Sequence, residues 1–305
     1  MENKKPTITI GIPAYNEEQN IGHLLNSLIS QHISSGDLSK ILVVSDASTD
    51  KTVEIVKSFS NPLTEIIQKE KREGAYKAQN MIVEITNSDI LIMLNADILP
   101  ADNSFIEKLV GPILADSKVG IVCGEMIASK PRTFFEKIMI NSYEIKKNIY
   151  SKINQEHNLY NCVGVARAFS KKLYKKIKWP EDLPEDAYSY FLCIGSGFSF
   201  VYAPSAKLIF RTPSNFKDYL KQSTRFFGGQ AKITDLFGKE VAEKEYRIPL
   251  SFMAYSILAS AIKSPLLTFT YLILMTYIKL FLPKSYQAKW QIATSTKEGI
   301  TLNHK

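Results

Sequence analysis

The sequence predicts an α/β fold, a doubly wound and mostly parallel sheet flanked by helices and followed by a C-terminal hydrophobic helical segment. Short apolar runs alternate with amphipathic helical patterns over residues 7–100, the order that βαβ units give. One run, residues 90–94, is apolar at every position, which is typical of a central strand covered on both faces. The third observation is a change to nearly continuous apolar sequence from residue 248.

Four strands are expected in the first hundred residues, with a helix after each of the first three. The first helix shows apolar residues at helical spacing, and we expect Asn16 to cap it, with Gln19 completing a capping box. The expected strands are residues 7–13, 40–44, 64–68 and 90–94, and the helices lie around 16–29, 50–59 and 74–86.

Polar loops follow three of these strands, with the sequences PAYNEE, SDASTD and NAD. Strands of a parallel sheet end at the same edge, where α/β proteins bind their ligands. The chain contains neither a G-x-G-x-x-G fingerprint nor a P-loop, so a nucleotide at this edge would be held by side chains and a metal. Asp97 is placed to hold Mg²⁺ or Mn²⁺ together with a phosphate, because both cations prefer oxygen ligands. The alternative for Asp97 alone is a carboxylate that opens a turn before Pro100.

Composition narrows the class of partner. The 305 residues carry a formal net charge of +8, which suits nucleic acid, an anionic membrane or phosphorylated substrates. No recognised nucleic-acid-binding motif accompanies the charge, so we expect no nucleic-acid partner. The three cysteines are far apart and odd in number, which predicts free thiols in a reducing compartment. The first seven residues are polar and charged, so no signal peptide is expected.

Six stretches of the sequence stand out in order and span most of residues 7–230. They are IPAYNEEQNI, VVSDASTD, REGAYKAQN, MLNADILP, LPEDAYSYFLCIGSGFSFVYAPSA and QSTRFFGG. In these stretches, and in their order, the chain resembles family 2 glycosyltransferases, which have the GT-A nucleotide-sugar fold. The resemblance implies inverting transfer of a sugar from a nucleotide-diphosphate sugar, most often UDP-linked. The acceptor it implies is a hydroxyl or phosphate on a lipid-linked glycan, a polysaccharide or a polyprenyl phosphate, and the cofactor is a divalent cation, Mg²⁺ or Mn²⁺.

The resemblance also implies roles for single residues. Asp186 matches the general base, and Asp97 matches the metal ligand. Tyr15 would lie near the nucleotide base, Asp46 would hydrogen-bond to it, and Arg225 would belong to the Q-x-x-R-W motif. The full set of implied donor-binding residues is Pro13, Tyr15, Glu17, Asp46, Arg72, Asn95, Gln222 and Arg225.

Plainer interpretations of three of these residues stay open. Asp186 also suits the capping position of a helix that starts at Ala187. Arg225 also fits a solvated helix face, and Tyr15 fits a packed loop aromatic.

The chain departs from the family pattern at three positions. Ser45 and Asn95 stand where the family often has a second acid, and Phe226 replaces the tryptophan of the Q-x-x-R-W motif. Asn95 still offers a neutral oxygen to a metal or to a bound water. Phe226 keeps a stacking face but lacks the indole N–H, which puts processive synthesis in doubt.

The C-terminal part predicts attachment to a membrane. We expect residues 1–230 to form the catalytic domain, 231–247 an amphipathic linker, 248–283 membrane-associating helices and 284–305 a polar tail. Residues 248–262 are short for a span of about 20 residues, and Lys263-Ser264-Pro265 separates them from the second apolar segment. Basic residues flank both ends, which favours a hairpin or in-plane helices at the cytoplasmic face of a membrane. The alternative is a buried helical pair.

Residues 170–178 form a second candidate for membrane contact. Five lysines alternate there with apolar residues. This pattern suits a membrane-surface helix or, equally, a solvated basic helix.

Two other functions fit parts of the sequence. A non-catalytic nucleotide-sugar-binding subunit of a membrane complex is favoured by Asn95 and Ser45, whereas Asp186 and Arg225 together count against it. A nucleotidyltransferase of similar fold would need a glycine-rich basic loop near the N-terminus, where the chain has the acidic PAYNEE.

Overall fold

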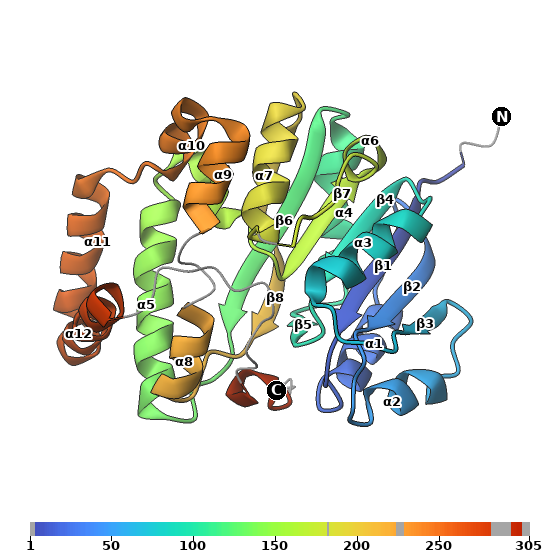
Figure 1. The fold of residues 1–305 in the computed structure, drawn as a ribbon, viewed down its shortest axis with the longest axis horizontal. Helices are drawn as coiled ribbons and strands as arrows, with labels where there is room; N and C mark the ends of the chain where they lie inside the picture. The colour runs from blue at the N-terminus through green and yellow to red at the C-terminus, as the bar shows by residue number, and fades with distance from the viewer. Residues whose placement is uncertain (1–3, 182, 224–228, 282–293, 301–305) are drawn as a thin grey trace.

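The protein is built around one mixed, eight-stranded sheet with the strand order β3-β2-β1-β4-β7-β6-β8-β5 (Figure 1). The computed structural model describes residues 4–181, 183–223, 229–281 and 294–300. The strands are β1 Thr7–Ala14, β2 Asp37–Ser45, β3 Thr64–Gln68, β4 Ile90–Leu94, β5 Ile98–Pro100, β6 Val119–Ala128, β7 Ala166–Ser170 and β8 Ser199–Phe210.

Helices cover both faces of this sheet, and a further layer lies beside it. The helices are α1 Ile21–Ile29, α2 Thr52–Ser58, α3 Ala75–Ile85, α4 Phe105–Ala115, α5 Phe134–Tyr150, α6 Lys171–Tyr174, α7 Glu185–Gly195, α8 Phe216–Ser223, α9 Gly229–Phe237, α10 Lys239–Tyr246, α11 Leu250–Lys263 and α12 Pro265–Phe281, with short 3₁₀ turns at Asn154–Glu156, Leu159–Asn161 and Thr294–Lys297.

Strand direction divides the sheet into two halves. β1 runs parallel to β2 and β4, and β2 runs parallel to β3, which confirms the predicted βαβ order for residues 7–94. The other half is mixed, because β6 runs parallel to β8, whereas β7 is antiparallel to β4 and β6, and β5 is antiparallel to β8. The expected parallel direction therefore fails at β7 and β5. β7 is reached after the long excursion through α5 rather than through a βαβ crossover, so nothing forces it to run parallel to β4.

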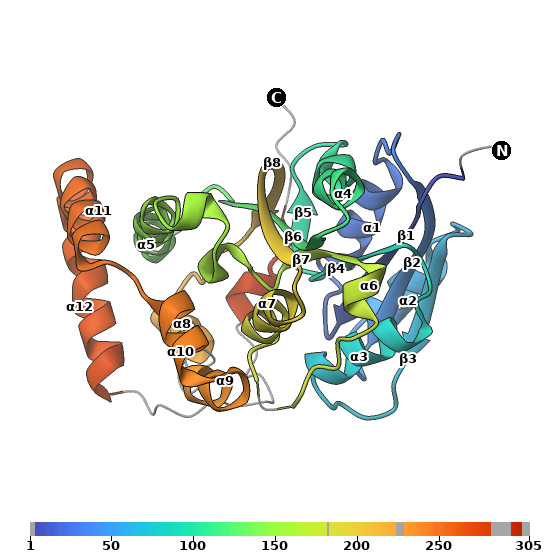
Figure 2. The ribbon, with the colours of Figure 1, turned by 90° about the horizontal axis from the view of Figure 1, so that it is seen from above.

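β4 connects the two main cores, as its apolar run predicts. Ile90, Ile92 and Leu94 belong to the core beneath α1 and α4. Leu91 and Met93 face the other side, beneath α3, α6 and α7. Figure 2 shows these two helix layers on opposite faces of the sheet. All five residues of β4 are buried, which is why the strand lacks the alternating pattern of a half-exposed strand.

The start of α1 differs from the expected position. The helix begins at Ile21, and the residue at its N-cap position is Asn20, whereas we expected Asn16 to be the cap. Asn16 has a φ of 53°, in the left-handed region, and its Oδ1 accepts a hydrogen bond from the backbone N–H of Thr49. Asn16 therefore shapes the loop after β1 and does not cap the helix.

The two apolar C-terminal segments form two helices, α11 and α12, separated at Ser264. They pack on α5 through a third core that includes Ile138, Ile145, Tyr271 and Ile278. Among the helices in the described part of the chain, none has the length and apolarity needed to cross a bilayer.

Residues 170–178 do not form the membrane-surface helix that was one of their two interpretations. The helical part is only α6, and Leu173, Tyr174 and Ile177 are buried in the core of the sheet. Lys171 and Lys175 donate hydrogen bonds to the backbone carbonyls of residues 87 and 86. The apolar side chains are therefore used for packing inside the protein, and two of the lysines cap backbone groups.

Candidate active site

The loops that follow β1 and β2 are bonded to one another, as their place at the carboxyl ends of neighbouring strands predicts. We call residues 15–20 the β1 loop. The backbone N–H of Glu17 donates to Thr52 Oγ1 at 2.7 Å, and that of Glu18 donates to Asp50 Oδ2 at 3.0 Å. Because the contacts pair backbone with side chains, they fix the path of the β1 loop.

Asp46 connects the second polar loop to the loop after β3. Its buried carboxylate accepts hydrogen bonds from Lys69 Nζ at 2.6 Å and from the backbone N–H groups of Glu73 and Gly74 at 3.0 and 2.7 Å. The loop held in this way carries Arg72, whose guanidinium lies 4.1 Å from the centre of the Tyr15 ring. That distance is a cation–π contact. The structure thus brings Tyr15, Asp46 and Arg72 together, while their contact with a nucleotide base stays a prediction.

Glu17 and Asp97 place two carboxylates near each other at the ends of β1 and β4. Burial and the negative charge of Asp97 together raise the pKa of Glu17 to about 7, although Lys297 acts in the opposite direction. Asn95, two residues before Asp97, is anchored by its backbone N–H, which donates to the carbonyl of Val165 at 2.9 Å.

This donor set fits a hard divalent cation. Mg²⁺ and Mn²⁺ are commonly held by one or two carboxylates while the substrate's phosphates fill the remaining positions. Within the described residues, no group of three or more His, Cys, Asp or Glu side chains could hold a metal alone. The neighbouring carboxylates of Glu17 and Asp97 would give such a cation a partial set of oxygens that a bound diphosphate could complete, and the contact of Asn95 with a metal stays a prediction.

Asp186 lies in the first turn of α7, where its Oδ1 accepts the backbone N–H of Ala187 at 2.8 Å. Burial raises the pKa of its carboxyl, although the nearby guanidinium of Arg167 lowers it. Gly164 lies beside the carboxylate, since a Cβ built there would stand only 4.0 Å from Oδ2. Asp186 therefore makes a local contact with its own helix and is also a stronger base than an ordinary aspartate.

No motif pointed to Arg167, yet this residue organises the surroundings of Asp186. Its guanidinium is fully buried and donates to the carbonyl of Glu185 at 3.0 Å, to Ser189 Oγ at 2.9 Å and to Gln79 Oε1 at 3.1 Å. The available signal was a charged residue inside the otherwise small and apolar stretch ARAFS. A fully buried arginine needs such partners, because an unpaired buried charge is costly.

The remaining predicted residues lie at the margin of this cluster or outside it. Pro13 is near the end of β1 and is half-buried. Gln222 lies in the last turn of α8 and is half-buried. Arg225 and Phe226 lie outside the described residues, so the proposed Q-x-x-R-W match stays a prediction.

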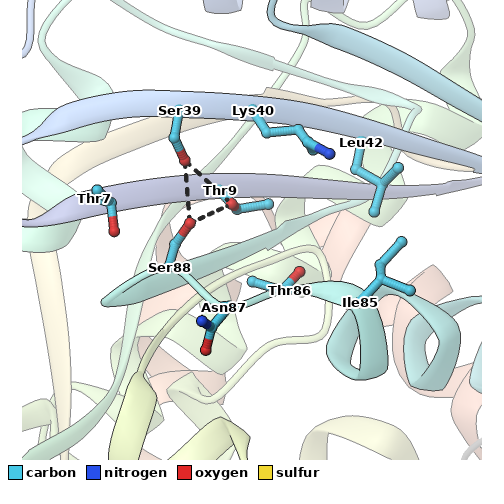
Figure 3. A pocket seen from close by; sticks show the side chains of 9 residues that line it. All are labelled: Thr7, Thr9, Ser39, Lys40, Leu42, Ile85, Thr86, Asn87 and Ser88. Carbon is cyan, nitrogen blue, oxygen red and sulfur yellow. Dashed lines mark hydrogen bonds between the residues drawn. The ribbon is translucent and has the colours of Figure 1, made fainter.

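A cavity of about 290 Å³ lies at the opposite end of the strands from this site. Figure 3 shows Thr9, Ser39 and Ser88 with their hydroxyls directed toward one another. Thr9 Oγ1 and Ser88 Oγ are 2.6 Å apart. The cavity opens beside the amino ends of β1 and β2, so it is separate from the polar loops described above.

Comparison with known proteins agrees with this arrangement. The model of the family described as glycosyl transferase family 2 matches residues 9–178, which is more than half of the chain. The chain belongs to glycosyltransferase family 2. The match covers β1 to β7 and includes every loop that supplies the Tyr15, Asp46, Arg72 and Asp97 cluster.

Two curated glycosyltransferases are similar to part of this chain. Glycosyltransferase AglE of Haloferax volcanii is 32% identical over 133 residues, which cover 43% of this chain and 43% of AglE. The 4,4'-diaponeurosporenoate glycosyltransferase of Staphylococcus aureus is 24% identical over 161 residues, 52% of this chain and 38% of that protein. The chain thus matches less than half of the length of these two relatives.

Solved structures show that the fold is of the GT-A type. Mannosyltransferase PcManGT from Pyrobaculum calidifontis, in complex with GDP-Man and Mn²⁺, has a TM-score of 0.59 at 19% identity. That alignment covers 92% of this chain and 77% of PcManGT. S. aureus TarS in complex with UDP has a TM-score of 0.56 at 16% identity and covers 91% of this chain and 75% of the other.

Proposed function

We propose that this family 2 protein transfers a sugar, with inversion, from a nucleotide-diphosphate sugar to an acceptor hydroxyl or phosphate. The observation that carries the proposal is the meeting of three loops at one sheet edge, with a cation on an aromatic ring and two neighbouring carboxylates. Such a site offers stacking and positive charge to a nucleotide and oxygens to the cation of its diphosphate. The fold likeness to proteins solved with GDP-Man and Mn²⁺ and with UDP supports the donor class.

The residues divide between the leaving group and the acceptor. Mg²⁺ or Mn²⁺, held by Asp97 with Glu17 and Asn95, would stabilise the negative charge that develops on the leaving diphosphate. Tyr15 and Arg72 would hold the nucleotide so that the anomeric carbon faces the first turn of α7. Activation of the acceptor would fall to a residue of α7.

Asp186 would take the proton of the acceptor hydroxyl as its oxygen attacks the anomeric carbon. The new C–O bond forms as the bond from that carbon to the diphosphate oxygen breaks, and the proton passes to the Asp186 carboxylate. A raised pKa suits this step, because a base is more effective when its pKa lies nearer the working pH. Attack from the face opposite the leaving group inverts the anomeric centre.

Donor turnover by the detergent-extracted protein tests this function. We would offer UDP- and GDP-sugars with Mn²⁺ or Mg²⁺, with a membrane lipid extract as the source of acceptor, and repeat the assay with EDTA. We expect release of nucleotide from one donor and loss of that release on chelation. A protein that binds a donor but never turns it over would instead favour the non-catalytic subunit.

We also propose that α11 and α12 attach the protein to the cytoplasmic face of a membrane. One side of this pair packs on α5, while other side chains face solvent. Ile262 and Leu266 are 78% and 64% exposed, and a large contiguous apolar surface is typical of an interaction site. Figure 1 shows the two helices as an outer layer beside α5. The exposed large apolar residues of this layer are Leu250, Tyr255, Leu258, Ile262, Leu266, Phe269, Leu272, Ile273, Tyr277, Leu280 and Phe281.

Binding to lipid vesicles tests the membrane proposal. We expect wild-type protein to float with vesicles containing anionic lipid, and the double variant Ile262→Asn, Leu266→Asn to bind them at least about tenfold more weakly, since each buried apolar side chain contributes more than 1 kcal/mol. The matched control is Leu236→Asn, which removes an equally large side chain, 55% exposed on α9. Equal binding by all three proteins would contradict the proposal.

A further inference from the structure

The C-terminal strap, residues 294–300, packs against the β1 loop although the two segments lie at opposite ends of the sequence. The ammonium of Lys297 donates to the backbone carbonyls of Tyr15 and Asn16 and to the carboxylate of Glu17. In return, Asn20 Nδ2 donates to the carbonyl of Lys297 at 2.9 Å. Figure 1 shows the strap in red between α8 and the end of the sheet that carries β1.

The strap is anchored on its other side by Arg211, by α8 and by the core. Arg211 donates through Nε to the carbonyl of Glu298 at 3.2 Å and through Nη2 to that of Gly299 at 3.3 Å. Asp218 of α8 accepts the backbone N–H of Ser295 at 2.9 Å. Ile300 is 2% exposed and belongs to the core beneath α1 and α4. These contacts hold Lys297 at a fixed place relative to both the sheet and the β1 loop.

Lys297 uses all of its hydrogen-bonding capacity on the β1 loop. An ammonium has three N–H donors, and the three acceptors belong to three successive residues, 15, 16 and 17. The middle residue, Asn16, has the left-handed φ of 53°. Asparagine adopts this conformation more readily than most residues, and the hydrogen bonds that its carbonyl accepts from Lys297 and its side chain accepts from Thr49 hold it there.

Lys297 also changes the electrostatics of the cation site. Glu17 and Asp97 are near enough for their negative charges to repel each other. The ammonium bonds to Glu17 and compensates one of these two charges. Nζ lies 5.8 Å from the centre of the Tyr15 ring, so the same group also reaches the residue placed beside the nucleotide.

We propose that Lys297 is a positioning residue of the donor site, which holds the β1 loop and the Glu17 carboxylate in the arrangement that receives a nucleoside diphosphate and its cation. This inference rests on the proposed function. Part of the donor site would then come from the C-terminal strap, which follows the hydrophobic helices in the sequence. The nucleotide affinity would depend on a residue 280 positions from Glu17.

Titration calorimetry with UDP and with GDP, each with Mn²⁺, tests the proposal. We expect Lys297→Met to weaken binding of the preferred nucleotide by about tenfold, the effect of losing one charge-assisted hydrogen bond. Lys297→Arg, which keeps the charge and the donors, should recover most of the affinity. The matched control is Lys239→Met, because Lys239 is a 79% exposed lysine paired with Glu243 on α10.

A double-mutant cycle separates positioning from simple loss of stability. If Lys297 acts through Glu17, adding Lys297→Met to Glu17→Gln should cost much less nucleotide affinity than it costs in wild type. Thermal unfolding of each variant establishes that the proteins are folded at the temperature of the titration. Additive losses, or wild-type affinity in Lys297→Met, would overturn the proposal while leaving the proposed function intact. Wild-type protein that binds neither nucleotide would overturn both.

Hydrogen exchange of the wild-type protein supplies a test that needs no variant. We expect UDP or GDP with Mn²⁺ to slow exchange of backbone amides both in the β1 loop and in residues 294–300. Protection confined to the β1 loop, with exchange of the strap unchanged, would contradict the role of Lys297.

Discussion

Two carboxylates of the candidate site differ in what surrounds them. Next to the β1 loop, the buried Asp46 accepts hydrogen bonds from the ammonium of Lys69 and from two backbone N–H groups. In the first turn of α7, the half-buried Asp186 accepts the N–H of the next residue, and desolvation outweighs the nearby guanidinium of Arg167, so that its pKa is raised. The donors around Asp46 hold neighbouring loops together, whereas the raised pKa of Asp186 favours uptake of a proton.

This difference teaches how to separate a structural acid from a reactive one. A carboxylate whose oxygens are occupied by fixed donors holds other parts of the chain in place, as Asp46 does for the loop that carries Arg72. A carboxylate that burial makes more basic is a candidate for proton transfer, because perturbed pKa values gather at functional sites. Substitutions at the two positions should therefore affect different properties of the protein.

The largest expected effect is on turnover by Asp186→Asn. Loss of a general base lowers kcat by about 10²–10⁴-fold, while UDP or GDP binding should stay close to that of wild type. The matched control is Glu185→Gln, which changes the neighbouring acid in the same turn of α7. Steady-state rates with the preferred donor and calorimetry with its nucleotide measure the two quantities. If Glu185→Gln removes turnover and Asp186→Asn does not, the base is misassigned.

A smaller effect, on folding, is expected for Asp46→Asn. This change leaves the ammonium of Lys69, 7% exposed, with a weaker acceptor, and it should lower the free energy of unfolding by about 2 kcal/mol. The control is Glu65→Gln, which breaks an ion pair with Lys40 of the same 2.6 Å length between side chains that are about half exposed. Exposed pairs contribute less than about 1 kcal/mol, so urea unfolding should separate the two variants. Equal losses would show that burial does not set the strength of these pairs.

The strands and loops around Tyr15, Asp46 and Asp97 were predictable from the sequence because their signals are local. β1 to β4 each follow from a short apolar run, and their loops follow from the turn-forming residues behind each strand. Strands that end at one edge must bring Tyr15, Asp46 and Asp97 to the same side of the sheet, as the structure shows. The direction of β7 was not predictable in this way, because it depends on pairing with β4 and β6 after an excursion through α5.

Three cationic residues near the site, Lys69, Arg167 and Lys297, were missed because, as for the direction of β7, their contacts are long-range. Lys69 lies in the run KEKREG, where composition indicated only a charged loop. Lys297 reaches Glu17 across 280 residues, and Arg167 reaches Gln79 across 88. Such contacts depend on tertiary packing, so no periodicity or motif in the sequence around Lys297 or Arg167 predicts them.

The smallest expected effect completes the comparison, because Asp186→Asn should stabilise the fold where Asp46→Asn weakens it. Desolvation raises the folded-state pKa of Asp186 above the ordinary value of 3.8, so at pH 7 the folded protein bears the cost of a desolvated, ionised carboxylate. Asparagine removes that charge, and the thermal midpoint at pH 7 should rise. As pH falls through the raised pKa toward 3.8, Asp186 becomes neutral in the folded protein and the advantage of the variant should disappear. Thermal unfolding across this pH range measures the difference in midpoint between Asp186→Asn and wild type. A variant less stable than wild type at pH 7 would mean that Asp186 is a structural acid of the same kind as Asp46.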